Sequence, residues 1–105
     1  MNTRWTSGTL GTTEHVLVSC KNNSRAKIEQ IIVTNIAGST RQYDIYHVPK
    51  GQTSSSDDAI AFEVTLGSKR VAVFEGPIYL LPGDELRVKA SAASSLNIFA
   101  YGQQT

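Results

Sequence analysis

Short runs of β-branched and aromatic residues recur along this chain, and clusters of Gly, Ser, Asn, Asp and Pro separate them. Apolar residues spaced three and four positions apart, the mark of an amphipathic helix, are almost absent. Short apolar runs that follow one another at intervals of about 8 to 12 residues are typical of an all-β domain. The sequence therefore predicts an all-β fold: a two-sheet β-sandwich or jelly-roll of about eight strands.

The turn clusters define the expected strand limits. We expect strands at residues 15–20, 27–36, 41–48, 59–66, 70–75, 78–81, 85–91 and 96–101. The loop 37–40 has the length of a hairpin loop, and the loop 67–69 predicts that the strands on either side of it pair with each other.

Two further segments have a local signal of their own. The sequence Pro82-Gly83-Asp84 predicts a type II turn, with a positive φ at Gly83. In the polar segment 52–58 we expect at most one helical turn, because Ser55 and Asp58 have the spacing of a capping box.

The length of 105 residues indicates one domain, because two halves would each be too small to sustain a hydrophobic core. We expect an N-terminal arm at residues 1–13 and a single β-sandwich domain at residues 14–105. The arm is rich in Thr and Gly, and Trp5 and Leu10 are its apolar anchors. Their area is too small to offset about 1 to 2 kcal/mol of ordering entropy per residue, so the arm is expected to order only on a partner.

The composition disfavours two classes of partner. Ten Lys and Arg against nine Asp and Glu give a formal net charge of +1, which provides no long-range field to attract nucleic acid or an anionic membrane. No stretch reaches the roughly 18 apolar residues of a membrane helix, and the first residues contain no apolar region of signal-peptide length. We therefore expect a protein made in the cytoplasm, with no nucleic-acid partner and no membrane partner.

Residue types that usually carry catalysis or bind metals lack the spacing for either. His15 and His47 belong to no helical i, i+4 pair and to no HExxH motif. The pair Asp57-Asp58 lacks the alternating acidic spacing of a calcium loop. Cys20, the only cysteine, lies in an apolar run and is expected to be a small buried hydrophobe. We expect no enzyme activity, no cofactor, and no catalytic or metal-binding residues.

The chain has more apolar surface than one small sandwich can hide. The strand 27–36 is apolar on both alternating phases, as expected of a strand that is covered on both faces. Phe99 and Tyr101 lie out of phase with a core set that contains Ile98. Apolar surface in excess of the core marks a contact site. The expected oligomer or partner interface comprises Trp5, Leu10, Ile31, Val33, Phe99 and Tyr101.

Three segments, 31–51, 54–64 and 78–102, share a pattern with a known group of proteins. In the last segment the pattern consists of Leu80, Gly83, Asp84, Leu86, Val88, Ala90 and Gly102. With these segments the chain resembles small virion proteins of tailed bacteriophages that are built as β-sandwiches. The resemblance implies a structural or decorating role, with no cofactor and no active site.

We therefore expect a non-enzymatic bacteriophage virion structural protein, in the first place a capsid decoration (cement) protein that stabilises the head. Its partners would be the phage major capsid protein or other virion subunits, and it would form a homo-trimer or homo-dimer in a virion assembled in the host cytoplasm. A tail, neck or fibre-base subunit is the alternative within the structural class. A glycan-binding adhesion module is the alternative from another class, with Trp5 or the tyrosines as a stacking platform.

Overall fold

The computed structural model describes residues 2–21, 23–53 and 55–105. Its elements are β1 (Asn2–Thr9), β2 (His15–Ser19), β3 (Ala26–Asn35), β4 (Arg41–Val48), the 3-10 turn η1 (Ser56–Asp58), β5 (Ala59–Leu66), β6 (Val71–Leu80), β7 (Glu85–Ala90) and β8 (Leu96–Gln104). The single helical turn η1 lies where the polar segment predicts one. Within the described residues, no helix has the length and hydropathy to cross a membrane.

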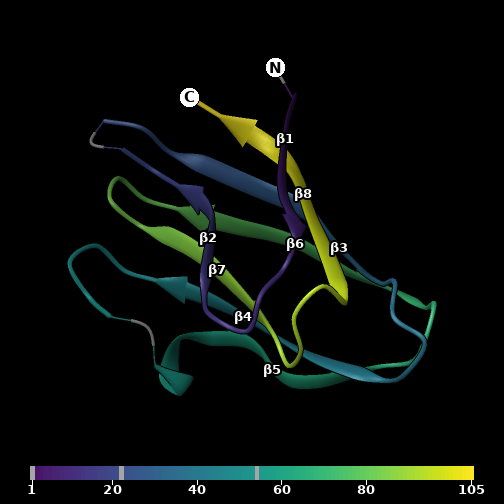
Figure 1. Cartoon of the computed structure of the whole chain (residues 1–105). Coiled ribbons are helices and arrows are strands. Elements are labelled where there is room, and N and C mark those ends of the chain that lie inside the picture. The colour runs from purple at the N-terminus through teal and green to yellow at the C-terminus, as the bar shows by residue number, and fades with distance from the viewer. Residues whose placement is uncertain (1, 22, 54) are drawn as a thin grey trace.

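The strands form two antiparallel sheets of four that pack face to face (Figure 1). Sheet A has the strand order β1-β8-β3-β6, and sheet B has the order β2-β7-β4-β5. The pairing is nested, because β4 pairs with β5, β3 with β6, β2 with β7 and β1 with β8, as in a long hairpin that is rolled up. This arrangement is an eight-strand jelly-roll, so the predicted fold class is confirmed.

Strand β1 belongs to sheet A, which differs from the expectation of an arm at residues 1–13. It runs antiparallel to β8, with Trp5 opposite Ala100, and Figure 1 shows the two strands side by side. Trp5 packs against the core, and Leu10 is buried in it. The expectation considered only the apolar residues of the segment, whereas backbone hydrogen bonds to the edge of β8 also offset the ordering entropy. The sandwich therefore begins at β1 rather than at residue 14.

Neither of the two short loops forms a hairpin, because both lead from one sheet to the other. The loop containing residues 37–40 joins β3 in sheet A to β4 in sheet B, and residues 67–70 join β5 in sheet B to β6 in sheet A. The predicted strands 70–75 and 78–81 are one strand, β6, which continues through Gly76-Pro77. The length of a loop does not distinguish a hairpin from a crossing between packed sheets, which lie only about 10 Å apart.

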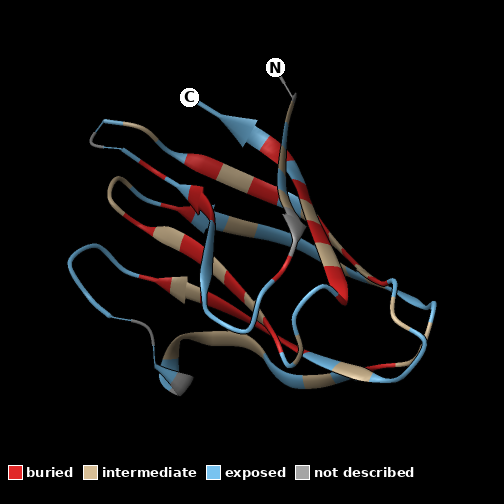
Figure 2. Cartoon of the chain, viewed as in Figure 1, coloured by how far each residue is buried: buried red, intermediate tan, exposed pale blue. Residues whose placement is uncertain are grey.

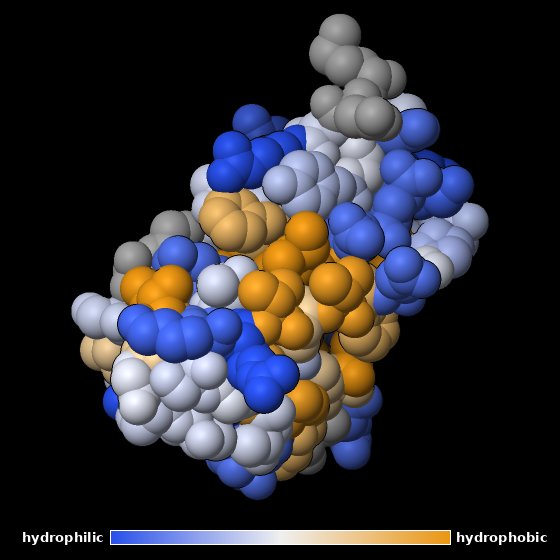
Figure 3. All heavy atoms as spheres, turned by 90° about the vertical axis from the view of Figure 1, so that its right-hand side faces the viewer, coloured by the Kyte–Doolittle hydropathy of each residue, from blue (hydrophilic) through white to orange (hydrophobic). Residues whose placement is uncertain are grey.

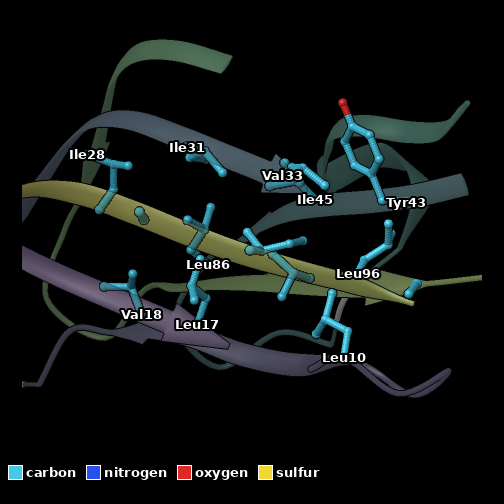
Figure 4. Packing of buried hydrophobic residues seen from close by; sticks show 14 of the residues in the cluster. Leu10, Leu17, Val18, Ile28, Ile31, Val33, Tyr43, Ile45, Leu86 and Leu96 are labelled. Atoms are coloured by element: carbon cyan, nitrogen blue, oxygen red, sulfur yellow. The ribbon is translucent and has the colours of Figure 1, made fainter. Parts of the chain in front are cut away.

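The core lies between the two sheets and is apolar. Its largest fully buried side chains include Leu10, Ile28, Ile31, Ile45, Leu80, Leu86, Leu96 and Ile98. Figure 4 shows side chains from both sheets pointing into the space between them, and Figure 2 shows buried residues alternating with more exposed ones along β7 and β8. Cys20 is 2% exposed and lies within this cluster, which confirms the prediction of a small buried hydrophobe.

A β-bulge in β3 explains why this strand is apolar on both phases. Ile28 and Gln30 pair with neighbouring residues of β8, so Glu29 between them has no partner there. The extra residue shifts the alternation, and Ile28 and Ile31 both point into the core with 0% exposure. The bulge therefore accounts for the two apolar phases of β3 within one sandwich, and cover of its outer face by a partner stays a prediction.

The turn between β6 and β7 has the geometry that its Pro-Gly sequence predicts. Gly83 has a φ of 90°, as required at the third position of a type II turn. The Asp84 N–H donates to the Leu81 carbonyl oxygen at 3.0 Å and closes the turn. The Gly83 N–H donates to the Cys20 carbonyl oxygen at 2.8 Å, which ties the turn to the end of β2.

The side chain of Asn35 joins two crossings between the sheets. Asn35 is 1% exposed. Its Nδ2 group donates to the carbonyl oxygens of Leu66 at 2.9 Å, Gly67 at 3.1 Å and Ser39 at 3.0 Å. Its Oδ1 atom accepts the Ala37 N–H at 2.9 Å. One buried carboxamide therefore holds both the β3–β4 loop and the β5–β6 loop.

The substitution Gly102→Ala should destabilise the fold. Gly102 is buried in β8 beside the bulge, and a Cβ atom there would lie 1.9 Å from the Lys27 carbonyl oxygen. Because β3 and β8 would have to move apart, we expect a loss of about 1 to 3 kcal/mol or more in the free energy of unfolding. Gly38→Ala is the control, since a Cβ atom at Gly38 meets nothing within 4 Å. Equal urea midpoints for the two variants would contradict this expectation.

The substitution Asn35→Ala should also destabilise the fold, through lost hydrogen bonds rather than a clash. It would leave the buried Leu66 carbonyl and the Ala37 N–H without their side-chain partner. Unpaired buried polar groups are destabilising by about 1 to 3 kcal/mol each, so we expect a total loss of at least about 2 kcal/mol. The control is Asn97→Ala, because Asn97 Oδ1 has no hydrogen-bond partner in the described part of the chain. Thermal midpoints that fall equally in both variants would rule out a special role for Asn35.

Candidate functional site

The outer face of sheet A carries an exposed apolar surface. Cross-strand pairing places Val73, Ile32 and Phe99 in one row over β6, β3 and β8. Val71 lies beside this row on β6, and Tyr101 lies beside it on β8. We call these five residues the apolar face. Figure 3, which turns the right-hand side of Figure 1 toward the viewer, shows apolar side chains gathered in the middle of that side between hydrophilic ones.

Three side chains of the apolar face are well exposed. The exposed fractions are 57% for Val71, 53% for Val73 and 38% for Tyr101. Single exposed apolar side chains are ordinary on a protein surface, but a contiguous group of them marks a contact site. The apolar face is therefore the strongest candidate for a functional surface of this chain.

Charged side chains border the apolar face on both sides of sheet A. Arg4 of β1 lies with its guanidinium over the ring of Phe99, 4.7 Å from the ring centroid, in a cation–π contact. Glu75 lies on β6, at the opposite edge of the sheet. One cross-strand row contains Arg4, Tyr101, Gln30 and Glu75. Within the described part of the chain, neither Arg4 nor Glu75 forms an ion pair.

Two of the six predicted interface residues lie on the apolar face. Phe99 and Tyr101 point outward, as their phase predicts, because Ile98 and Ala100 are fully buried. Their outward orientation is confirmed, with Tyr101 exposed and Phe99 partly buried, and their contact with a partner stays a prediction.

The other four predicted interface residues pack in or against the core. Leu10, Ile31 and Val33 are at most 2% exposed. Trp5 is partly buried and packs against the core cluster. The bulge in β3 turns Ile31 and Val33 inward, and β1 leads Leu10 between the sheets. The interface prediction is wrong for Leu10, Ile31 and Val33, because their buried side chains have no exposed surface for a partner.

The remaining members of the apolar face, Ile32, Val71 and Val73, were not predicted. The sequence does show Val71 and Val73 alternating with Ala72 and Phe74. Because both phases of this strand are apolar, alternation alone does not reveal which of them points outward.

The outer face of sheet B differs, because its charged groups pair with one another. The Asp44 carboxylate accepts hydrogen bonds from the Tyr46 hydroxyl at 2.8 Å and from the Glu63 N–H at 2.7 Å. Lys89 Nζ lies 3.5 Å from the same carboxylate. Burial, together with the hydrogen bond to Asp44, raises the pKa of the Tyr46 hydroxyl, so Tyr46 acts as a donor.

A depression of about 180 Å³ opens beside this cluster. It is lined by Gln42, Asp44, Glu63, Lys89, Ala90 and Ser91. The most buried polar group in it, the Asp44 carboxylate, already has three partners from the chain itself, which leaves it little capacity for a ligand. In residues 2–21, 23–53 and 55–105, no three His, Cys, Asp or Glu side chains are grouped so that they could hold a metal ion.

His47 pairs with the turn between β6 and β7. Its Nε2 atom lies 3.1 Å from Asp84 Oδ2. The Asp84 carboxylate also accepts the N–H groups of Leu81 at 3.0 Å and Lys50 at 3.2 Å. Burial opposes ionisation of Asp84, but the hydrogen bonds from His47 and the two backbone N–H groups outweigh it and lower the pKa of this carboxyl. The pair therefore anchors the turn to β4.

Comparisons with known proteins leave the family of this chain open. No family model matches the sequence, and no curated protein matches it significantly. A solved chain described as "Structure of infectious bursal disease virus Gx strain" aligns with 97% of this chain at 14% identity and a TM-score of 0.45. The alignment spans 30% of that longer chain. A likeness this distant assigns neither a family nor a function to the present chain.

The lowered pKa of Asp84 predicts a loss of stability in acid. Because the folded-state pKa lies below the unfolded value of about 3.9, the contribution of Asp84 is complete above about pH 5 and is lost as the pH falls through the folded-state pKa. Asp84→Asn should therefore be less stable than the wild type near neutral pH and depend less on pH in acid. Thermal midpoints of both proteins, measured from neutral pH into strong acid, test this. Parallel profiles would show that Asp84 is not responsible.

Proposed function

We propose that this chain is a non-enzymatic structural subunit of a bacteriophage virion, and specifically a capsid decoration protein that stabilises the head. Its partners are copies of itself and the major capsid protein or other virion subunits. The observation that carries the proposal is the exposed apolar face of sheet A with its charged borders.

The shape of this surface favours a protein partner. Small ligands bind in concave sites that enclose most of their area. The apolar face instead consists of side chains that stand on neighbouring strands of one sheet. An apolar centre with a polar border is the usual composition of a protein–protein interface.

The fold and the sequence resemblance support the same proposal. Jelly-rolls occur in viral capsid domains and in lectins, although a fold alone does not imply a function. Several residues of the phage-like pattern have a structural role in this fold. Gly83 adopts a positive φ, and the Asp84 carboxylate anchors the turn. Gly102 allows β3 and β8 to approach closely. The residues that carry the resemblance therefore also determine the shape of the sandwich, as expected of a structural protein.

The glycan-binding alternative loses part of its support. A stacking platform for sugar rings needs an open aromatic face. Trp5 packs against the core, and Tyr43 and Tyr46 are buried. This leaves Tyr79 and Tyr101 as its exposed tyrosines. A tail, neck or fibre-base subunit would use the same surface as a decoration protein and would differ from it in copy number.

The copy number of this protein in purified particles tests the proposal. A decoration protein covers the shell and is present in hundreds of copies, whereas a tail, neck or fibre-base subunit is present in a handful. Quantitative mass spectrometry of particles measures this number. We expect hundreds of copies. A handful would favour the alternative within the structural class, and absence from the particles would overturn the proposal.

A matched pair of variants tests the role of the surface in incorporation. Val73→Asp places an unpaired carboxylate in an apolar contact, so it should reduce the number of copies per particle severalfold. Val16→Asp is the control, because Val16 is 40% exposed on sheet B. Equal incorporation of the two variants would contradict a role for the apolar face.

A further inference from the structure

We propose that the apolar face of sheet A binds the same face of a second copy of this chain, which forms a two-fold symmetric dimer. The symmetry axis runs parallel to the strands, midway between β8 and β3. The inference deepens the proposed function by naming the partner of this surface, and it rests on that function only in treating the apolar face as a contact surface.

The strand order of sheet A makes its outer face suitable for such a contact. The order is β1-β8-β3-β6, so the middle of the sheet lies between β8 and β3. A half-turn about this middle line places β1 of one copy over β6 of the other, and β8 over β3. Residues of one cross-strand row lie at the same height along the axis. In the dimer, each row therefore lies opposite the same row of the other copy, with its residues in reverse order.

One of these rows places opposite charges against each other at both of its ends. It runs from Arg4 on β1 through Tyr101 and Gln30 to Glu75 on β6. In the dimer, Arg4 of each copy faces Glu75 of the other. Sheets packed face to face lie about 10 Å apart, a gap that an Arg and a Glu side chain can close from opposite sides. The cation–π contact with Phe99 already holds the Arg4 guanidinium above the outer face, on the side from which a second copy approaches.

The next row places apolar groups against each other. It consists of Thr6, Phe99, Ile32 and Val73. After the half-turn, Phe99 faces Ile32, and Val73 faces the methyl group of Thr6. The contact is then apolar along its middle and charged at its border, which is the ordinary arrangement of a protein interface.

The edges of sheet A are less suited to association than its face. The register of β1 against β8 shifts between Thr6 and Thr9. The opposite edge strand, β6, contains Pro77, which has no N–H to donate. Bulges and prolines in edge strands hinder the pairing of two sheets into one. Within sheet A, the apolar face is therefore better suited than either edge for contact between two copies.

The size of the face predicts a dimer of moderate affinity. Four strands spaced about 4.8 Å apart, and the ten residues of β3 with a rise of about 3.3 Å, give roughly 600 Å² per copy. Two copies would bury about 1,200 Å² in total, the lower end of the range for specific interfaces. We therefore expect a dimer that dissociates measurably in the micromolar range.

Two charge reversals that cancel each other test the proposal. In its own dimer, Arg4→Glu places two carboxylates together at both ends of the charged row, and Glu75→Arg places two guanidinium groups together there. In an equimolar mixture of the two variants, both ends carry opposite charges again. Sedimentation equilibrium should show wild-type dimers, a dissociation constant raised about tenfold or more for each variant alone, and recovery of the dimer in the mixture.

The controls separate the interface from folding and from the virion role. Lys21→Glu reverses a charge on an exposed loop and should dimerise as the wild type does. Val73→Asp should give folded monomers by circular dichroism, which keeps the test decisive if a charge variant fails to fold. A wild type that is monomeric or trimeric well above micromolar concentration, or a mixture that stays monomeric, would overturn the dimer. Hundreds of monomers bound per particle would rule out the dimer and support the proposed function. A dimer that is absent from particles would support the dimer and rule out the virion role.

Discussion

The buried carboxamide of Asn35 is the interaction on which the rest of the jelly-roll depends. In this fold every connection except the one from β4 to β5 crosses between the sheets, so the positions of the loops determine how the sheets lie on each other. Asn35 binds the β3–β4 loop and the β5–β6 loop through its side chain, and its own N–H donates to the Arg70 carbonyl at 2.9 Å. Because buried amides are normally paired, an arrangement that moves these loops away from Asn35 leaves its carboxamide without partners and is disfavoured.

The sequence predicts the features that depend on neighbouring residues, but it does not predict those that depend on contacts between segments far apart in the chain. The Pro82-Gly83 turn and the phase of Phe99 and Tyr101 follow from local spacing, and both are confirmed. The bulge at Glu29 depends on a close approach by β8 at Gly102, some seventy residues away, which no local pattern contains. As a result Ile31 and Val33 are core residues, and the outward residue Ile32 takes their place on the candidate surface.

The two outer faces of the sandwich differ in how far their side chains find partners within the same chain. On sheet B the charges of Asp44 and Lys89 lie together, and Arg87 pairs with Glu85 and Glu14. Such groups are satisfied within one chain and gain little from a partner. On sheet A the exposed valines Val71 and Val73 gain from any contact that removes them from water, at about 25 cal/mol per Å². This difference, rather than total hydrophobicity, is the reason why the proposed contact with other subunits is placed on sheet A.

Strand β1 decides whether sheet A can face a copy of itself. Without β1 the sheet would be β8-β3-β6, its middle line would run along β3, and no positive charge would stand opposite Glu75. With β1 in place, Trp5 packs inward against the core and leaves Arg4 on the outer face. Folding of β1 and dimerisation are then linked, because a partner that binds only the four-stranded sheet stabilises the strand that completes it. In the proposed dimer, the segment that was expected to be a partner-binding arm would contact the partner as an edge strand of the sandwich.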